Sequence, residues 1–298
     1  MFEVQDFDMF FLLSRGNKME TKLLDGKQCA SIIHEQIIKD VQNLKKMNII
    51  PYLAVILVGS DKASQVYVNR KEKLAKRLGI ATKTYYFSSD VDENIVLQLI
   101  DELNNDKSVH GILVQMPLPK HLQENKIIEA ISPDKDVDGF HPLNIGKLSE
   151  NEAQFLPCTP YGIMTLLEKN QCDISGKNCV VIGRSAIVGK PLATLLLQQN
   201  ATVTICHSQT KNLKQYTKMA DYIFVSIGQA HFLTEDMIQD DVVLIDVGIN
   251  REHGKIVGDI DPSCYQKAKR YTPVPGGVGP MTLAMLMKQT IEIAQREV

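Results

Sequence analysis

Two hydrophobic patterns alternate along the chain. Residues 27–46 place apolar positions among polar ones at helical spacing, and residues 53–58 form a continuous apolar run that ends at Gly59. A short apolar run closed by glycine is typical of a parallel strand buried on both faces. Residues 63–78 return to the helical pattern and end before Gly79, as helices often do. This region therefore predicts helix, strand and helix in succession.

The same alternation continues toward the C-terminus. We expect further strands at 80–87, 111–115, 179–182, 201–206, 222–227 and 242–247, and further helices at 92–105, at 160–170, from a glycine-rich turn to 199, and from Met281. Strands that alternate with helices form βαβ units, whose strands are parallel. The pattern predicts an α/β fold throughout.

A change in composition near the middle of the chain predicts two domains. The chain has 298 residues, which is enough for two domains with their own buried cores. Residues 132–160 are rich in Pro, Gly, Asp and Asn, which favours a junction there. We expect an N-terminal α/β domain at 20–150 and a domain with a Rossmann-type parallel sheet at 151–280, with a cleft between them.

Charge and hydropathy narrow the class of partner. The net charge is −2 and no basic run is present, so nucleic acid and an anionic membrane surface are not expected as partners. No segment approaches the ~18 uninterrupted apolar residues of a membrane span. Composition alone therefore favours an ordinary globular protein and suggests neither disorder nor a fibrous fold.

Cysteines, histidines and the N-terminus add three further expectations. The six cysteines include no C-x-x-C pair and the seven histidines are dispersed, so we expect reduced thiols in the cytoplasm and no metal site. Residues 9–13 are apolar but follow acidic residues, whereas a signal peptide needs a positive flank and a longer apolar stretch. We expect residues 1–19 to be an extension outside the functional unit.

The segment Gly183-Arg-Ser-Ala-Ile-Val-Gly189 predicts a dinucleotide site. It leaves an apolar strand and opens a helix, so its backbone N–H groups would face a pyrophosphate. The next strand ends in Cys206-His207-Ser208, without the carboxylate that grips the ribose hydroxyls of NAD. Arg184 and Ser208 could instead bind a 2′-phosphate, which favours NADP. An ordinary surface arginine and a helix-capping serine remain the alternative.

Lys71 stands on an unexpected face of the helix at 63–78. At ~100° per residue from Tyr67, Leu74 and Leu78 lie within about 20° and Lys71 lies at about 40°, inside the apolar stripe. The opposite side carries the charged residues Glu72, Lys73 and Lys76. An amine removed from water gives up its proton more easily, which suits an acid or base near neutral pH. A long side chain that reaches solvent is the alternative.

Two further polar residues stand where ligand sites occur. Gln115 ends a strand, and the carboxyl ends of parallel strands carry ligands, although a turn-forming amide is the more common case. Asp134-Lys-Asp-Val-Asp-Gly139 resembles a calcium loop, but Ile145 occupies the position that requires glutamate. Calcium is therefore excluded, and Asp138 is either a turn residue or a carboxylate that binds a ligand.

The run from Thr272 to Pro280 is dense in proline and glycine and carries no charge. Linkers are usually polar, and glycine lets backbone approach a ligand closely. We therefore expect this run to line the cleft, with a linker as the alternative.

Taken together, these segments resemble the bifunctional methylenetetrahydrofolate dehydrogenase/cyclohydrolase family from about Lys22 to the end. The matching stretches are Ser64-x-x-Tyr67-Val-x-x-Lys71, Val114-Gln-Met-Pro-Leu-Pro119, Lys135-Asp-Val-Asp-Gly139, Cys158-Thr-Pro160, Gly183-Arg-Ser-x-Ile-Val-Gly-Lys-Pro191, Cys206-His-Ser208, Asp246-Val-Gly-Ile-Asn250 and Thr272-Pro-Val-Pro-Gly-Gly-Val-Gly-Pro-Met-Thr282. Met116 replaces the usual leucine.

The resemblance implies a role for each candidate residue. Tyr67 would stack on the folate, Lys71 would be the acid/base, Gln115 would hold Lys71, and Asp138 would anchor the pterin. Substrate would also contact Pro275, Gly276 and Gly277. The NADP-binding residues would be Gly183, Arg184, Ser185, Ile187, Val188, Gly189, His207, Ser208 and Ile249.

The resemblance also implies the reaction. The enzyme would oxidise 5,10-methylenetetrahydrofolate with NADP and then hydrolyse the methenyl product to 10-formyltetrahydrofolate at the same site. Residues 20–150 would form the folate-binding catalytic domain, completed by a C-terminal helix at 281–298, and 151–280 would bind NADP. The protein would be a homodimer.

Three alternatives come from other classes. A monofunctional dehydrogenase would keep the glycine turn but lose Lys71. A two-domain NADP dehydrogenase acting on shikimate-like hydroxy acids would share the architecture but would not explain Tyr67, Lys71 and Gln115. A non-catalytic NADP sensor would leave the motifs of the first domain without a purpose.

Overall fold

The computed structural model describes residues 22–297, and the extension expected at 1–19 lies outside them. The helices are α1 (Gly26–Lys46), α2 (Lys62–Leu78), α3 (Glu93–Asn105), α4 (Glu124–Ala130), α5 (Pro142–Ser149), α6 (Cys158–Lys169), α7 (Gly189–Gln198), α8 (Leu213–Thr217), α9 (Cys264–Lys267) and α10 (Val278–Ala294). The strands are β1 (Tyr52–Val58), β2 (Ala81–Phe87), β3 (Gly111–Val114), β4 (Asn178–Ile182), β5 (Thr202–Cys206), β6 (Tyr222–Val225), β7 (Val243–Asp246), β8 (Asn250–Glu252), β9 (Lys255–Val257) and β10 (Arg270–Tyr271).

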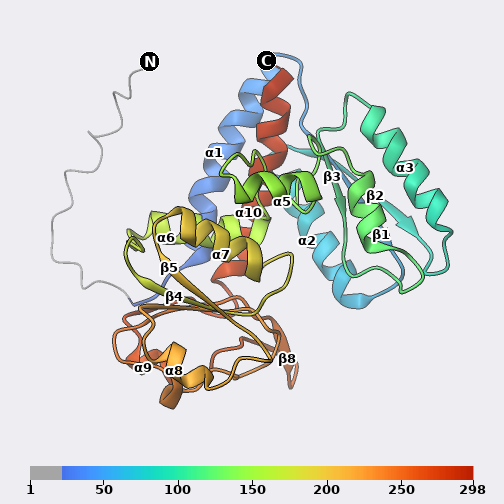
Figure 1. Cartoon of the computed structure of the whole chain (residues 1–298). Coiled ribbons are helices and arrows are strands. Elements are labelled where there is room, and N and C mark those ends of the chain that lie inside the picture. The colour runs from blue at the N-terminus through green and yellow to red at the C-terminus, as the bar shows by residue number, and fades with distance from the viewer. Residues whose placement is uncertain (1–21, 298) are drawn as a thin grey trace.

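Two parallel sheets confirm the predicted α/β fold. The first has the order β2-β1-β3, and its central strand β1 is buried along almost its whole length. The second has the order β10-β7-β6-β4-β5. The two sheets lie in different parts of the molecule, with α1 and α10 running between them (Figure 1). The strand β10 and the small antiparallel hairpin of β8 and β9 were not expected from the hydrophobic pattern.

Local sequence signals explain where the main helices of the first half begin and end. The carboxylates of Asp25, Asp61 and Asp92 accept hydrogen bonds from backbone N–H groups at the starts of α1, α2 and α3. Such caps satisfy donors that have no partner within the helix. Gly79 ends α2 in the left-handed conformation with φ 83°, which glycine adopts without a steric penalty. The predicted end of α2 before Gly79 is confirmed, and the starts expected at 27, 63 and 92 each lie within one residue of the observed ones.

Helix α10 forms the centre of the molecule. It packs against α1 and α6, and its buried residues lie on all sides of the helix, Met281, Met285 and Ile291 among them. A helix that is apolar all round is stable only when other elements surround it. It begins at Val278, three residues before the expected Met281, because the end of the proline- and glycine-rich run, residues 278–280, already adopts helical geometry. None of the helices in the described part of the chain has the length and apolar character of a membrane span.

The middle segment is more ordered than its composition suggests. Residues 132–160, expected as a junction, contain the whole of α5 and the start of α6. Pro142 stands in the first turn of α5, where a missing N–H does no harm, and the His141 ring accepts a hydrogen bond from the Leu143 N–H. Proline here starts a helix and does not mark a linker.

We predict that the contact between α6 and α10 limits stability. A Cβ atom at Gly162 would lie 3.0 Å from the Cβ and carbonyl carbon of Met281. Gly162→Val should therefore lower the free energy of unfolding by about 1–3 kcal/mol through overpacking, measured by urea denaturation. Gly146→Ala on α5 is the matched control, because no atom lies within 4 Å of its added Cβ, and it should leave stability unchanged or slightly raised. Equal stability of the Gly162→Val variant and the wild type would contradict this account of the packing.

Candidate active site

Lys71 is buried in α2, with 9% of its surface exposed. Its Nζ donates a hydrogen bond to Gln115 Oε1 at 3.0 Å. The Gln115 amide is oriented in turn, because its Nε2 donates to the Met116 carbonyl at 2.7 Å. The amine therefore ends inside the protein, at the carboxyl end of β3. The contact agrees with the expectation that Gln115 holds Lys71 in place.

Asp138 lies beside this pair on a loop that Asp136 folds. The Asp136 carboxylate accepts hydrogen bonds from the N–H groups of Phe140 at 3.2 Å and His141 at 2.8 Å, and from Asn144 Nδ2 at 2.9 Å. The second of the three aspartates that resembled calcium ligands, Asp136, thus holds its own loop together. Removal from water raises the pKa of the Asp138 carboxyl, and the positive charge of Lys71 acts in the opposite direction.

Cys158 and Gln289 both bind the backbone of the Asp138 loop, and no pattern in the sequence indicated Gln289. Gln289 Nε2 on α10 donates to the carbonyls of Val137 at 2.8 Å and Leu156 at 3.0 Å, and its Oε1 accepts from the Leu156 N–H at 2.8 Å. The Cys158 thiol donates to the same Val137 carbonyl at 3.1 Å. Burial, and next the charge of Asp138, raises the pKa of this thiol. The C-terminal helix therefore fixes the position of Asp138.

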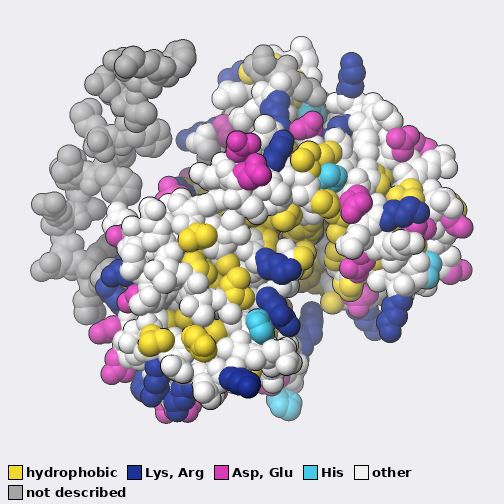
Figure 2. Space-filling model, in the orientation of Figure 1, with side chains coloured by type: hydrophobic (Ala, Val, Ile, Leu, Met, Phe, Trp, Pro, Cys, Tyr) yellow, Lys and Arg dark blue, Asp and Glu magenta, His cyan; other side chains and the backbone are white. Residues whose placement is uncertain are grey.

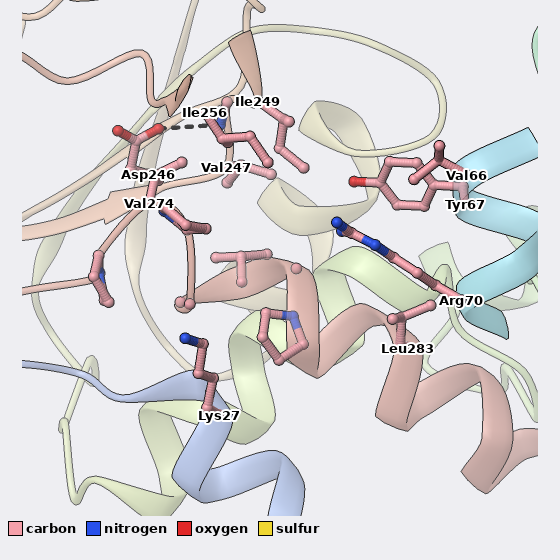
Figure 3. Close-up of a pocket in the computed structure, with 18 of the residues that line it drawn as sticks. Lys27, Val66, Tyr67, Arg70, Asp246, Val247, Ile249, Ile256, Val274 and Leu283 are labelled. Carbon is pink, nitrogen blue, oxygen red and sulfur yellow. Dashed lines mark hydrogen bonds between the residues drawn. The ribbon is translucent and has the colours of Figure 1, made fainter. Parts of the chain in front are cut away.

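A cavity of about 900 Å³ lies between α2 and the loops that follow β7 and β10. Of the expected substrate- and cofactor-binding residues, its lining includes Tyr67, Ile249, Pro275, Gly276 and Gly277. Tyr67 and Arg70 extend into it from α2 and face Ile249 and Val274 (Figure 3). The space-filling view shows the same arrangement on a larger scale, with hydrophobic side chains in the hollow between the two halves and basic ones at its edge (Figure 2).

Tyr67 separates this cavity from the buried lysine. Lys71, Gln115 and Asp138 do not line the cavity, because Lys71 lies on the other side of Tyr67 around α2. Burial raises the pKa of the Tyr67 phenol, and the charges of Arg70 and Arg251 oppose that shift. The neutral ring therefore stands between a polar cluster and an apolar cavity.

The glycine turn lies at the carboxyl end of β4 in the second sheet. The Gly183 N–H donates to the Cys206 carbonyl at 2.9 Å, so the turn and the residues after β5 start from neighbouring strand ends. A Cβ at Gly183, whose φ is 126°, would lie 2.7 Å from Ser226 O, and only glycine fits. Ser185 Oγ accepts the N–H groups of Val188 at 3.2 Å and Gly189 at 3.3 Å.

The polar groups expected to bind NADP are open to solvent in this region. Arg184, Ser185, Ile187 and Ser208 are exposed, and His207 is half-buried and accepts the Gln209 N–H at its Nδ1. A carboxylate at the end of β5 would repel a 2′-phosphate, and none stands there. The turn, the two strand ends and Arg184 fit NADP in charge and in placement.

Sequence reasoning missed a buried pair of carboxylates behind the loops of the second sheet. Asp246 accepts the N–H groups of Gly248, Asp259 and Ile260, and Asp259 accepts those of Ile227 and Gly228. Burial raises the pKa of Asp246 to about 6. The pair ties the ends of β6 and β7 together, and only the motif at 246–250 hinted at it.

One expectation needs correction. Lys73 was placed on the solvated side of α2, opposite Lys71, and it is exposed, but it also lines the cavity beside Arg70 and Arg77. The helical projection correctly gave the face, but it could not show that another part of the chain lies over that face. Within residues 22–297 no three His, Cys, Asp or Glu side chains are grouped to hold a metal ion, and the six cysteines are free.

Fold and site together define a two-domain α/β enzyme with a dinucleotide-binding turn and a buried lysine beside its cleft. Two family models match: "Tetrahydrofolate dehydrogenase/cyclohydrolase, catalytic domain" over residues 24–138 and "Tetrahydrofolate dehydrogenase/cyclohydrolase, NAD(P)-binding domain" over 157–298. The chain therefore belongs to the tetrahydrofolate dehydrogenase/cyclohydrolase family.

Individual relatives agree. A Bifunctional protein FolD from Bacillus subtilis is 52% identical over 280 residues, which is 93% of this chain and 99% of the relative. A bifunctional FolD structure from Campylobacter jejuni is 49% identical with a TM-score of 0.92, and covers 93% of this chain and 99% of that one. A FolD structure from Trypanosoma brucei, complexed with NADP cofactor and inhibitor, is 33% identical with a TM-score of 0.88, and covers 92% and 97%.

Proposed function

We propose that a single cleft, with Lys71 as its acid/base, carries out both reactions of this enzyme. The protein oxidises 5,10-methylenetetrahydrofolate to 5,10-methenyltetrahydrofolate with NADP and hydrolyses that product to 10-formyltetrahydrofolate. The observation that carries the proposal is the buried Lys71 amine, held at 3.0 Å from Gln115 Oε1 and next to Asp138.

For the oxidation, the protein mainly supplies orientation. Asp138 would hold the pterin, and Tyr67 would stack on the aminobenzoate that leads away from it. Pro275, Gly276 and Gly277 would close the opposite wall, where the two glycines let backbone approach the substrate. When bound, NADP supplies the hydride acceptor. Because hydride transfer requires no proton from the protein, Lys71 is not needed for this step.

For the hydrolysis, the protein must move protons. A water oxygen would bond to the carbon bridge of the methenyl cation and lose a proton to Lys71 in its neutral form. The bond from that carbon to N5 then breaks, the hydroxyl proton leaves as the formyl carbonyl forms, and N5 gains a proton. The sum is one water consumed and one proton released to solvent. Gln115 would hold the amine in place through this exchange.

NADP would be held by residues from the ends of two neighbouring strands. The turn Gly183–Gly189, with Ser185, Ile187 and Val188, would bind the pyrophosphate, and Arg184 with His207 and Ser208 would bind the 2′-phosphate. The hydrogen bond from the Gly183 N–H to the Cys206 carbonyl supports this placement, and Ile249 would contact the cofactor from the end of β7.

The larger organisation is also a proposal. Residues 20–150, completed by 281–298, would form the folate domain, and 151–280 would form the NADP domain. The packing of α10 against α1 supports the first assignment. We further propose a cytoplasmic homodimer that binds neither nucleic acid nor membrane, and the six free cysteines agree with a reducing compartment.

Lys71→Met should separate the two reactions. We expect hydrolysis of methenyltetrahydrofolate to fall by about 10²-fold or more, while NADPH formation from methylenetetrahydrofolate persists, because only hydrolysis requires proton transfer. Both are followed spectrophotometrically on purified protein. Lys76→Met, on the exposed side of the same helix, is the control and should change neither rate. Unchanged hydrolysis in Lys71→Met would remove the lysine from the mechanism.

Arg184→Gln should weaken NADP specifically. The loss of a charged hydrogen bond, about 1.5–3 kcal/mol, should raise the KM for NADP by at least about tenfold and leave the weaker use of NAD unaffected. Lys177→Gln, exposed at the opposite end of β4, is the control. An equal effect on both cofactors would show that Arg184 does not contact the 2′-phosphate.

A further inference from the structure

Two buried aspartates lie side by side behind the strand ends of the second sheet. Asp246 is 1% exposed and Asp259 is 0% exposed, and the Asp259 N–H donates a hydrogen bond to the Asp246 carboxylate at 2.9 Å. Burying two carboxylates together is unfavourable, because each loses water and each repels the other. A pair that costs stability is expected where function requires it, and the mechanism described above gives this pair no role.

Asp246 holds the loop that follows β7. Its Oδ1 accepts hydrogen bonds from the N–H groups of Gly248 at 3.0 Å and Asp259 at 2.9 Å, and its Oδ2 accepts one from the Ile260 N–H at 2.9 Å. Both oxygens therefore bind backbone donors. Because Gly248 is held in this way, the next residue, Ile249, reaches the cavity.

Asp259 holds the loop that follows β6. Its Oδ2 accepts the N–H groups of Ile227 at 2.8 Å and Gly228 at 3.0 Å. Its Oδ1 accepts Asn250 Nδ2 at 2.9 Å, at the residue where β8 begins. One carboxylate thus joins the loop after β6 to the base of the hairpin formed by β8 and β9.

Two glycines let the carboxylates approach the backbone this closely. A Cβ atom at Gly248 would lie 2.1 Å from the Asp259 Oδ1, and one at Gly258 would lie 1.9 Å from the Asp246 Oδ2. Any other residue at these two positions would push a carboxylate away from its donors. The loops after β6 and β7 therefore cannot shift unless the pair shifts with them.

These two loops lie on one side of the glycine turn. In the second sheet, β6 and β7 follow β4 on the side away from β5, where the 2′-phosphate would bind. At ~4.8 Å between neighbouring strands, β7 lies roughly 10 Å from β4. The end of β7 borders the cavity through Val247 and Ile249, which lie between Asp246 and Tyr67 in Figure 3. The nicotinamide end of a dinucleotide bound across these strand ends would therefore meet the loops that the pair holds.

We infer that Asp246 and Asp259 are positioning residues for the oxidation, which hold the loops after β6 and β7 so that the nicotinamide lies within reach of the carbon bridge of the folate. The inference rests on the placement of NADP proposed above. Hydride transfer requires the two reacting carbons to be about 3–3.5 Å apart, and a displacement of ~1 Å lowers the rate by up to about 100-fold. The hydrolysis needs no nicotinamide and takes place beside Lys71, so it does not depend on the pair.

Asp246→Asn tests the inference with little change in shape. Because both oxygens accept backbone N–H groups, either orientation of the new amide turns its NH₂ toward a backbone donor, which must move away. We expect kcat for NADPH formation to fall roughly 10- to 100-fold, while hydrolysis of methenyltetrahydrofolate in the absence of NADP keeps its rate. The change in nicotinamide fluorescence when NADPH binds should diminish. The affinity for 2′,5′-ADP, which lacks the nicotinamide half, should stay the same.

Two further variants complete the experiment. Asp221→Asn is the matched control, because the Asp221 carboxylate accepts the Asn178 N–H at 2.8 Å at the opposite end of β4, and it should leave all four readouts unchanged. If Asp246→Asn does not fold, Asp259→Asn takes its place, since the Asn250 amide can turn to face the new side chain. Its weaker, neutral hydrogen bonds should lower kcat for the oxidation about threefold or more, again without an effect on hydrolysis.

The contrary outcomes are distinct. An unchanged kcat for the oxidation in the folded variant would overturn the inference. Equal losses in oxidation, hydrolysis and 2′,5′-ADP affinity would also overturn it, because they would indicate a general effect on the fold. Arg184→Gln tests the placement of NADP separately, since it should weaken the binding of 2′,5′-ADP. If it does not, the proposed cofactor site itself is wrong.

Discussion

The site depends on keeping the charge of one lysine inside the protein. An ammonium group taken out of water is unfavourable unless other groups compensate it, and here the compensation comes from Gln115 Oε1 at 3.0 Å and from the nearby Asp138. The contact with Gln115 requires the end of β3 to lie beside α2, and the contact with Asp138 requires the loop held by Asp136 to lie there as well. Gln289 on α10 donates a hydrogen bond to the Val137 carbonyl of that loop, so α10 also helps to position it. Distant segments are therefore joined around one side chain.

The same arrangement explains how a small set of residues can serve two reactions. Strands of both sheets end toward the cleft, with Gln115 after β3 on one side and Gly183 and Ile249 after β4 and β7 on the other. Tyr67 stands at the boundary, between the polar cluster around Lys71 and the apolar cavity. In the proposed mechanism, substrate orientation and proton transfer thus come from opposite sides of the Tyr67 ring, and hydride transfer would proceed without the lysine.

Much of this was predictable from the sequence, where local rules apply. The strands, the helix ends at Gly79 and the burial of Lys71 follow from periodicity and capping, which depend on neighbouring residues alone. Three features could not be predicted in this way: the place of Lys73 and Arg77 in the cavity lining, the carboxylate pair of Asp246 and Asp259, and the anchoring by Gln289. Each depends on which segment lies over a given face, and that is decided by tertiary packing.

The claim that one cleft performs both reactions is tested most directly with tetrahydrofolate, which lacks the one-carbon bridge and so cannot react. Its inhibition constant would be measured on wild-type enzyme in the dehydrogenase assay and in the cyclohydrolase assay, with NADP present at the same concentration in both. A single cleft predicts the same inhibition constant in the two assays. Competitive inhibition of the oxidation with no inhibition of the hydrolysis would show that hydrolysis takes place at another site.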